Sequence, residues 1–388
     1  MKIAVPRERR AHERRVAATP ETVKKFVAMG FSVTIEAGAG LQSRIPDALY
    51  KEAGATIEPD VASVYKDAAL VLKVQRPMQA VEGDLDELAL IPKSALLLGI
   101  LSPFNAPESV AAYAGAGITA MALEFVPRIT RAQSMDVLSS QSNLAGYKAV
   151  LDAAVEYDRA MPMMMTAAGT VAPAKVMVLG AGVAGLQAIA TAKRLGAVVS
   201  ATDVRPVAKE QVESLGGRFV MVESDELKEA ETAGGYAKEM SEDFKRRQAE
   251  LVAQTIKTQD IVICTALIPG RKAPVLVNDE MVASMRPGSI IVDLAVEQGG
   301  NCTASRPGEV VDVNGVKVVG HFNVPSRIAA DASALYAKNL LNFVSPLVCA
   351  DGDGATAELA LDFEDEILAA ATLAHGGSVV HSAFTDNN

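Results

Sequence analysis

The chain has 388 residues, of which 49% are hydrophobic and 22% are charged, and its formal net charge at pH 7 is −10. This length suits two domains of ordinary size, and the composition excludes a largely disordered protein. The negative charge argues against a nucleic-acid-binding protein, and the sequence holds no unbroken apolar run of the ~18–20 residues that a membrane span requires.

The first third of the chain alternates between apolar runs typical of strands and longer runs typical of helices. Strands are predicted at residues 3–5, 33–36, 71–74, 96–100 and 118–123, and helices at 21–29, 46–53 and 106–113. This alternation predicts βαβ units and therefore a parallel sheet, here without a Gly-rich phosphate motif. The first strand follows Met1 directly, so no signal peptide is expected.

A long helix is predicted over residues 142–159, crossing from the first domain to a second. Strands of the second domain are predicted near residues 176, 198 and 219 and at 261–264, 290–292 and 316–319. Helical stretches at 327–348 and 356–373 should return to the first domain. We therefore predict an α/β protein of two Rossmann-like, doubly wound parallel-sheet domains, formed by residues 1–140 with 328–388 and by residues 141–327. The cleft between them is the expected site.

Residues 176–203 carry the strongest functional signal. An apolar strand is followed by GAGVAG, a helix, a second strand and Asp203. In such a βαβ unit Gly180 permits a tight turn, Gly182 lets the backbone approach a pyrophosphate, and Gly185 lets the helix lie close to the strand. The helix N-terminus attracts the phosphates. Asp203 would accept hydrogen bonds from the ribose hydroxyls and repel a 2′-phosphate, which predicts NAD(H) rather than NADP(H).

Further cofactor contacts are expected around this motif. Val183 and Val204 should contact the pyrophosphate and adenosine. Arg205 follows two residues after the acid and could serve a 2′-phosphate, but Asp203 stands at the expected strand end and decides the choice. Residues 223–243 are polar and contain glycines. They form either a solvated loop or a mobile lid whose Tyr236 folds over the nucleotide.

The cysteines and histidines carry no predicted chemistry. The three cysteines are odd in number and far apart, and two lie in apolar runs, so core thiols in a reducing compartment are expected. The four histidines show no paired ligand spacing, and no metal site is predicted.

Several longer motifs resemble the family that unites alanine dehydrogenases and proton-translocating transhydrogenases. They are residues 6–8 (PRE), 15–20 (RVAATP), 36–40 (EAGAG), 53–55 (AGA), 269–274 (PGRKAP), 285–289 (MRPGS), 292–295 (VDLA) and 298–300 (QGG). The resemblance covers nearly the whole chain and implies the two-domain fold predicted above.

The alanine dehydrogenase branch carries a substrate lysine, a catalytic histidine and an aspartate before QGG. The matching positions here are Gln75, Ser102 and Glu297, and of the substrate set only Arg15 remains. An imine substrate needs a proton donor and a polarising group, and Gln75 and Ser102 cannot supply both. We therefore interpret the amino-acid site as abandoned.

The transhydrogenase branch is matched by the polar loop at residues 127–141, which is otherwise interpretable as an ordinary interdomain linker. The resemblance implies that Arg128, Gln133 and Asp136 hold the nicotinamide carboxamide, its ribose and the domain junction. Further contacts implied along the chain are Ile129, Val137, Ser139, Gly235, Tyr236 and Leu267.

The resemblance implies the soluble NAD(H)-binding subunit of a proton-translocating NAD(P)+ transhydrogenase. Hydride would pass directly between NADH and NADP+, with NADP(H) and the membrane span on partner subunits because this chain ends at Asn388 without one. A homodimer is implied, located in the cytoplasm on the inner face of the cytoplasmic membrane through those partners, with no metal and no nucleic acid. The alternatives are an alanine dehydrogenase-like enzyme and an NAD-binding regulatory module without turnover.

Overall fold

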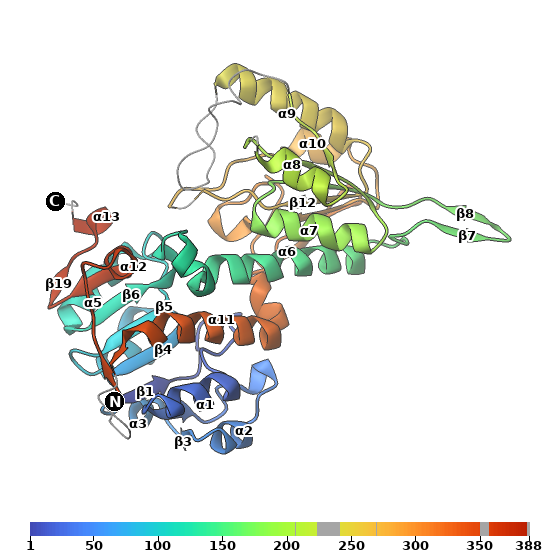
Figure 1. Ribbon diagram of the computed structural model, residues 1–388. Helices are drawn as coiled ribbons and strands as arrows, with labels where there is room; N and C mark the ends of the chain where they lie inside the picture. Colours follow the sequence, from blue (N-terminus) through green and yellow to red (C-terminus); the bar gives the residue numbers. More distant parts are fainter. Residues whose placement is uncertain (206, 223–240, 269, 350–356, 386–388) are drawn as a thin grey trace. The chain divides into compact units, whose positions relative to one another are not determined.

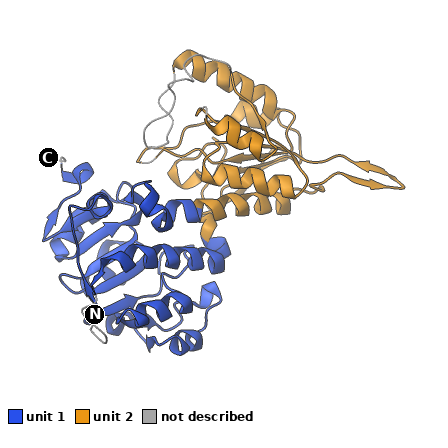
Figure 2. Cartoon of the chain, in the orientation of Figure 1, with its two compact units in different colours: residues 1–141, 326–388 blue, residues 142–325 orange. Residues whose placement is uncertain are grey.

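The computed structural model describes residues 1–205, 207–222, 241–268, 270–349 and 357–385. The chain divides into two compact units (Figure 2). Unit 1 comprises Met1–Gln141 and Ser326–Asn388, and unit 2 comprises Ser142–Pro325. Each unit is built on one predominantly parallel sheet, which confirms the predicted α/β class (Figure 1).

The sheet of unit 1 has the strand order β19-β18-β6-β5-β4-β1-β2-β3. Its strands are β1 (Lys2–Val5), β2 (Ser32–Glu36), β3 (Thr56–Glu58), β4 (Leu70–Gln75), β5 (Leu96–Ile100), β6 (Thr119–Ala122), β18 (Thr372–His375) and β19 (Ser378–Val379). The order 3-2-1-4-5-6 is that of a doubly wound sheet, whose direction of winding reverses between β1 and β4. β18 and β19 extend it as an antiparallel edge.

Helices cover both faces of this sheet. They are α1 (Pro20–Ala28), α2 (Asp47–Glu52), α3 (Val61–Tyr65), α4 (Glu87–Leu90), α5 (Pro107–Ala116), α11 (Ala329–Val344), α12 (Glu366–Ala371) and α13 (Ser382–Thr385). Alternate strand residues face opposite layers, so Ile3 joins the core with Phe26 of α1 and Tyr336 of α11, whereas Ala4 joins the core with Tyr113 of α5. Both faces of the sheet are therefore buried under helices, as expected of a parallel sheet.

The sheet of unit 2 has the strand order β11-β10-β9-β12-β13-β15-β14. Its strands are β9 (Lys175–Leu179), β10 (Val198–Thr202), β11 (Arg218–Phe219), β12 (Ile261–Cys264), β13 (Ile290–Asp293), β14 (Val310–Val313) and β15 (Val316–Val319). Winding reverses between β9 and β12, the crevice where doubly wound sheets bind ligands. Its last hairpin turns at Asn314 and Gly315, both with positive φ, as is typical of a two-residue Asn-Gly turn.

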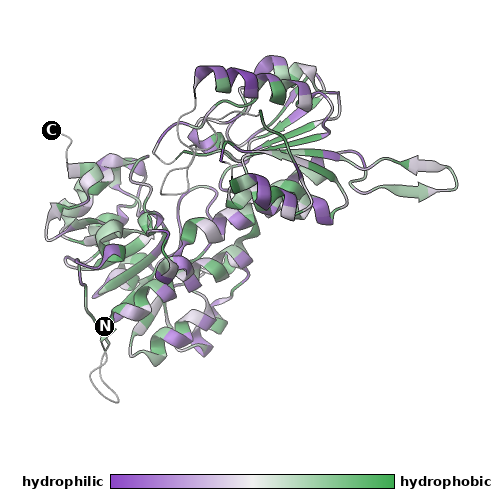
Figure 3. Cartoon of the chain, turned by 45° about the horizontal axis from the view of Figure 1, so that its top comes forward, coloured by the Kyte–Doolittle hydropathy of each residue, from purple (hydrophilic) through white to green (hydrophobic). Residues whose placement is uncertain are grey.

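The helices of unit 2 are α7 (Val183–Arg194), α8 (Val207–Ser214), α9 (Glu242–Ile256) and α10 (Asp279–Ser284), and α6 (Val137–Glu156) begins in unit 1 and continues into unit 2. In Figure 3 the central strands of unit 2 are largely hydrophobic, whereas α9 is mostly hydrophilic. Only Phe244, Val252 and Ile256 of α9 are buried, so most of this helix faces solvent. A separate hairpin, β7 (Met164–Thr166) and β8 (Gly169–Val171), extends away from the sheet (Figure 1).

The structure corrects three predicted elements. Residues 356–373 are not one helix, because their described part contains β17 (Glu358–Leu359), paired with β16 (Val348–Cys349), and the short helix α12 before β18. Pairing of β18 with β6 buries Leu373 and Ala374 and overrides the helical propensity of this alanine-rich run. The long helix α6 begins five residues before the predicted position, at Val137, and ends at Glu156 rather than residue 159. The helix predicted at 327–348 is limited to α11, which ends at Val344.

No helix in the described ranges is long and apolar enough to cross a membrane.

Candidate functional site

The glycine motif of unit 2 forms the turn at the carboxyl end of β9. Gly180 has φ of +99°, and a Cβ placed there would lie 2.8 Å from the Thr265 Oγ1 atom of the loop after β12. A Cβ on Gly185 would lie 1.8 Å from the carbonyl oxygen of Gly180. Both positions therefore require glycine, and the turn packs tightly against its own helix and against Thr265.

Gly182 differs from these two because it faces open space. A Cβ on Gly182 would meet only the Arg205 Nη2 atom, at 4.0 Å. Gly182 is also the N-cap of α7 and offers no side chain to the first N–H groups of the helix. The N-terminus of α7, which starts at Val183, is therefore suited to accept an anion such as a pyrophosphate.

Asp203 follows β10 and links the glycine turn to Arg205. Its Oδ2 atom accepts from the Ala181 N–H at 2.7 Å, and its carboxylate pairs with the guanidinium of Arg205. The side chains of Asp203 and Arg205 are 8% and 18% exposed. Val204, between them, packs against Phe244 of α9.

The loop after β12 lies beside the glycine turn. Thr265 Oγ1 donates to the carbonyl oxygen of Gly180 at 2.8 Å. The next apolar residues, Leu267 and Ile268, are each 42% exposed. Leu267 thus lies on the loop that borders the crevice between β9 and β12, where an apolar side chain can cover a bound ring.

The polar loop of unit 1 has an alternating pattern of exposure. Ala132 and Met135 are buried in the core, whereas Arg128 and Gln133 are exposed and Ile129 is half-buried. Residues 130–135 form a 3₁₀ helix whose inward residues fix it to the domain. The loop therefore presents Arg128 and Gln133 from a rigid support.

Three residues distant in sequence hold this loop in place. Asn339 and Asn342 of α11 donate from Nδ2 to the carbonyl oxygen of Ser134, at 2.8 and 3.0 Å. Arg131 donates to both oxygens of Asp365, at 2.7 and 3.0 Å, and this guanidinium holds the pKa of the Asp365 carboxyl below its usual value. No local sequence pattern indicates these supports, because they lie about 200 residues from the loop.

Asp136 caps helix α6. Its Oδ1 atom accepts from the Ser139 N–H at 2.8 Å, and its Oδ2 atom accepts from the Ser139 hydroxyl at 2.5 Å. Val137 is fully buried in the core of unit 1, so its side chain faces away from solvent. Asp136 and Ser139 thus have a structural role at a helix start besides the cofactor role predicted for them.

The crevice of unit 1, between β1 and β4, is filled by paired side chains. Arg15 donates to Glu13 through Nε and Nη2, at 2.8 and 2.6 Å, and through Nη1 to Gln141 Oε1 at 2.8 Å. Gln75 Nε2 donates to Glu13 Oε2 at 2.7 Å. The guanidinium of Arg15 is therefore neutralised within the protein.

A second buried ionic group lies beside the first. Lys73 Nζ contacts Glu87 Oε1 at 3.0 Å and Glu8 Oε2 at 3.5 Å, and all three side chains are almost fully buried. Burial raises the pKa of Glu8 to about 7 despite the nearby ammonium of Lys73. In the sheet of unit 1 these paired side chains lie beside β1 and β4, where its winding reverses. At the corresponding place in the sheet of unit 2, the glycine turn leaves open space at Gly182.

Ser102, which the resemblance aligns with the catalytic histidine of the alanine dehydrogenase branch, has φ of +49°. Its N–H and that of Leu101 donate to the carboxylate of Glu124, at 2.5 and 3.1 Å. Burial raises the pKa of Glu124 to about 7 although these two N–H groups favour the ionised form. Glu124 therefore holds this turn through its carboxylate.

The predicted residues fall into two groups, one in each unit. Unit 2 brings together Gly180, Gly182, Val183, Gly185, Asp203, Val204, Arg205 and Leu267 around the ends of β9, β10 and β12. Unit 1 holds the loop that carries Arg128, Ile129, Gln133, Asp136, Val137 and Ser139. Gly235 and Tyr236, with residues 223–240 of the predicted lid, lie outside the described residues, and Glu242 and Asp243 begin α9.

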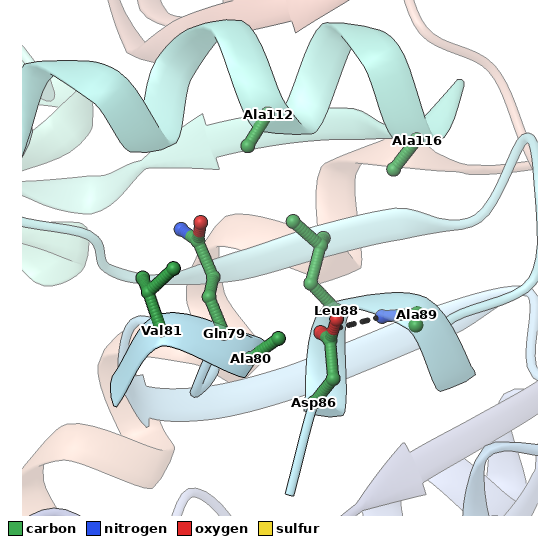
Figure 4. A pocket seen from close by; sticks show the side chains of 8 residues that line it. All are labelled: Gln79, Ala80, Val81, Asp86, Leu88, Ala89, Ala112 and Ala116. Atoms are coloured by element: carbon green, nitrogen blue, oxygen red, sulfur yellow. Dashed lines mark hydrogen bonds between the residues drawn. The ribbon is translucent and has the colours of Figure 1, made fainter. Parts of the chain in front are cut away.

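Two hollows lie away from both groups. One, of about 320 Å³, is in unit 1 and is lined by Leu88 and alanines of α4 and α5 together with residues 79–81 and Asp86 (Figure 4). Asp86 there caps α4 by accepting from the Ala89 N–H. The other, of about 330 Å³, includes Lys175 and Val198 at the amino ends of β9 and β10, opposite the glycine turn. In the described ranges no three acidic, histidine or cysteine side chains are grouped to bind a metal.

Comparison with known families assigns the chain. The N-terminal domain of alanine dehydrogenase/PNT matches residues 4–145, and the C-terminal domain of alanine dehydrogenase/PNT matches residues 149–382. The chain belongs to the alanine dehydrogenase/PNT family. The family predicted from the sequence motifs is thereby confirmed.

Within the alanine dehydrogenase/PNT family the chain is similar to transhydrogenase subunits. It is 58% identical over 385 residues to the first part of NAD(P) transhydrogenase subunit alpha of Rhodospirillum rubrum, covering 99% of both chains. The crystal structure of transhydrogenase from Sinorhizobium meliloti matches with a TM-score of 0.87 and 54% identity, covering 98% of this chain and 100% of that one. An alanine dehydrogenase of Halomonas elongata is 30% identical over 394 residues, covering 100% of this chain and 96% of the relative.

Proposed function

We propose that this chain is the NAD(H)-binding component of a proton-translocating NAD(P)+ transhydrogenase. The observation that carries the proposal is the contrast between the two crevices. Unit 2 has an open glycine turn beside an acid at the end of β10, whereas the corresponding crevice of unit 1 is filled by Arg15, Glu13 and Gln75. The described part of unit 2 can therefore hold a dinucleotide, whereas the described crevice of unit 1 offers no space prepared for an amino acid or oxo acid.

NAD(H) fits the groups present in unit 2. The open space at Gly182 and the N-terminus of α7 suit the pyrophosphate. Asp203 can accept from ribose hydroxyls when these replace the Arg205 guanidinium among its donors. Val183, Val204 and Leu267 would supply the apolar contacts. Gly180 and Gly185 act indirectly, because they give the turn its shape.

The reaction needs no acid or base from the protein at the reacting carbon. NADH held by this chain would supply the hydride chemistry, with NADP+ held by a partner subunit as the acceptor. The task of this chain is to orient one ring and to exclude water. We assign Arg128, Gln133 and Asp136 to the carboxamide, the ribose and the domain junction, with Ile129, Val137, Ser139, Gly235 and Tyr236 as further contacts.

The partners follow from this reaction. A subunit that binds NADP(H) and a subunit that spans the membrane are required, which would place this chain on the inner face of the cytoplasmic membrane. A homodimer is supported by the hairpin of β7 and β8, where Met163, Met164 and Met165 are 59, 43 and 79% exposed. Exposed methionines on an extended hairpin are suited to contact another protein surface.

The proposal is tested by binding and by reconstitution. The isolated chain should bind NADH in a fluorescence titration, and it should show only background turnover with alanine and NAD+. Hydride transfer from NADH to NADP+ should appear when the NADP(H)-binding and membrane-spanning partner subunits are added. Strong turnover of alanine would favour the amino-acid dehydrogenase, and NADH binding without any transfer would favour the regulatory module.

A further inference from the structure

Three loops of unit 2 meet at one buried side chain, Asn301. The first follows β12 and begins at Thr265, the second comprises residues 273–277, and the third follows β13 and contains Asn301 itself. Asn301 is 0% exposed. Because a buried amide must be fully hydrogen-bonded to be tolerated, its partners define what it does.

The side chain of Asn301 holds one residue at both of its backbone groups. Its Oδ1 atom accepts from the Ala266 N–H at 3.0 Å, and its Nδ2 atom donates to the Ala266 carbonyl oxygen at 2.9 Å. Nδ2 also donates to the carbonyl oxygen of Pro274 at 2.7 Å. The side-chain amide thus makes the pair of hydrogen bonds that a residue of a neighbouring strand would make, and it fixes Ala266 in one orientation.

The backbone of Asn301 is held just as completely. Its N–H donates to Asp293 Oδ2 at 2.9 Å, and its carbonyl oxygen accepts from the N–H groups of Leu276 and Val277, at 2.8 and 3.0 Å. Asp293 is 1% exposed and ends β13. Asn301 is therefore anchored to the sheet and cannot follow Ala266 if that residue moves.

Ala266 lies between two parts of the candidate site. On one side Thr265 donates to the carbonyl oxygen of Gly180, and a Cβ on Gly180 would lie 3.2 Å from the Ala266 nitrogen. On the other side comes Leu267, which is 42% exposed. A shift of Ala266 would therefore move both the support of the glycine turn and the apolar side chain that borders the crevice.

We propose that Asn301 is a positioning residue for dinucleotide binding, acting through Ala266 on the glycine turn and on Leu267. This inference rests on the proposed function, because it takes the crevice between β9 and β12 as the NAD(H) site. Asn301 does not contact the nucleotide. It fixes the loop that does, in the way that buried polar residues preorganise a binding site.

The experiment compares two variants of the full chain. Asn301→Ala removes all three side-chain hydrogen bonds, and Asn301→Asp retains an acceptor for the Ala266 N–H but has no donor for the two carbonyl oxygens. NADH affinity is measured by fluorescence titration, and amide exchange at Thr265 and Ala266 is measured by NMR. We expect NADH to bind about tenfold more weakly or worse to Asn301→Ala, because buried backbone groups lose their partners.

Amide exchange distinguishes positioning from general loss of stability. In Asn301→Ala the Ala266 amide should exchange faster, whereas the Thr265 amide should stay protected because it donates to Leu179 of β9. The control is Asn278→Ala, which removes an asparagine that caps α10 by accepting from the Met281 N–H at 2.9 Å. Its thermal stability should fall, but its NADH affinity and its Ala266 exchange should equal those of the parent chain.

The outcomes separate this inference from the proposed function. If the parent chain binds NADH and Asn301→Ala binds it equally well, the inference is wrong while the proposed function stands. An equal loss of affinity in Asn278→Ala would also overturn it, since the effect would then follow stability alone. If Asn301→Ala does not fold, unchanged NADH affinity in Asn301→Asp would be decisive against it. Failure of the parent chain to bind NADH would contradict the proposed function itself.

Discussion

Arg205 holds Asp203 with two parallel hydrogen bonds, Nε to Oδ1 and Nη2 to Oδ2, both 2.9 Å long. With the N–H groups of Ala181 and Arg205, the carboxylate accepts four hydrogen bonds, which is about the number of sites that a carboxylate has. Ribose hydroxyls can therefore reach Asp203 only by replacing some of these donors. The charge that should exclude a 2′-phosphate is balanced by the guanidinium beside it.

Nucleotide choice should respond in opposite directions to changes at these two residues. Asp203→Asn keeps an acceptor for the Ala181 N–H but removes the negative charge, and it leaves Arg205 available for a 2′-phosphate. The preference for NADH over NADPH should fall by about tenfold or more. Arg205→Ala leaves the carboxylate uncompensated and should increase the preference. Parallel titrations with NADH and NADPH measure both ratios, and a shift in the same direction for both variants would contradict the opposing roles of Asp203 and Arg205.

Alanine substitutions at two glycines of the turn should have different effects, one on NADH affinity and the other on the stability of the fold. Gly182→Ala places a methyl group in open space at φ of −75°, so the fold should tolerate it, but the methyl group occupies the approach of the pyrophosphate. NADH affinity should fall while the melting temperature changes little. Gly185→Ala instead forces a Cβ against the Gly180 carbonyl oxygen and should cost about 1–3 kcal/mol or more of unfolding free energy. Calorimetry beside an NADH titration checks the pair, and a large stability loss in Gly182→Ala would contradict the open space.

Gln133 should matter for hydride transfer more than for binding. Gln133→Asn keeps the amide but shortens its reach by one methylene, and misplacing a reacting ring by about an ångström can cost on the order of a hundredfold in rate. NADH affinity should change little, because unit 2 anchors the rest of the nucleotide. Single-turnover transfer with the partner subunits measures the rate. Ser134→Ala is the control, since only its carbonyl oxygen is used to hold the loop. If Gln133→Asn transfers hydride at the parent rate, the loop does not orient the nicotinamide and serves only as a linker between the units.

Glu124 should make unit 1 less stable as the pH rises. Its pKa is about 7 in the folded chain and near 4.5 when exposed, so the folded state binds the proton more tightly. The unfolding free energy should therefore fall between about pH 4.5 and pH 7, by up to ~3 kcal/mol. In Glu124→Gln the contribution of Glu124 to the fall of the unfolding free energy with pH should vanish. The fall that remains should be the one due to Glu8, whose pKa is also raised to about 7. Thermal melts of both chains from pH 5 to 8 check this, and identical slopes would contradict it.

The fold was predictable where the sequence is strongly patterned. Apolar runs locate most strands of both sheets, and β5 has the predicted bounds. β3 was missed because its three residues are at most half-buried and form no apolar run. The C-terminal edge was wrong because the pairing of β18 with β6 joins segments about 250 residues apart, which no local pattern reports.

The candidate site was predictable in its contact residues but not in its supports. The glycine spacing and Asp203 could be found because each has a local chemical reason at a fixed distance from a strand. Asn301 and Asn339 could not, because a buried asparagine is defined by partners from other loops. The pairing of Arg205 with Asp203 also needed coordinates, since spacing alone fits either a 2′-phosphate ligand or an internal ion pair.

The proposed function depends on direct hydride transfer from NADH on this chain to NADP+ on a partner subunit. The most direct test is one turnover of the reconstituted complex in ordinary water, with NADH deuterated at the transferred position of C4. We expect the deuterium to appear in NADPH without loss to solvent, and we expect no NADPH to form when this chain is left out. NADPH carrying hydrogen from water, or formed equally well without this chain, would contradict it.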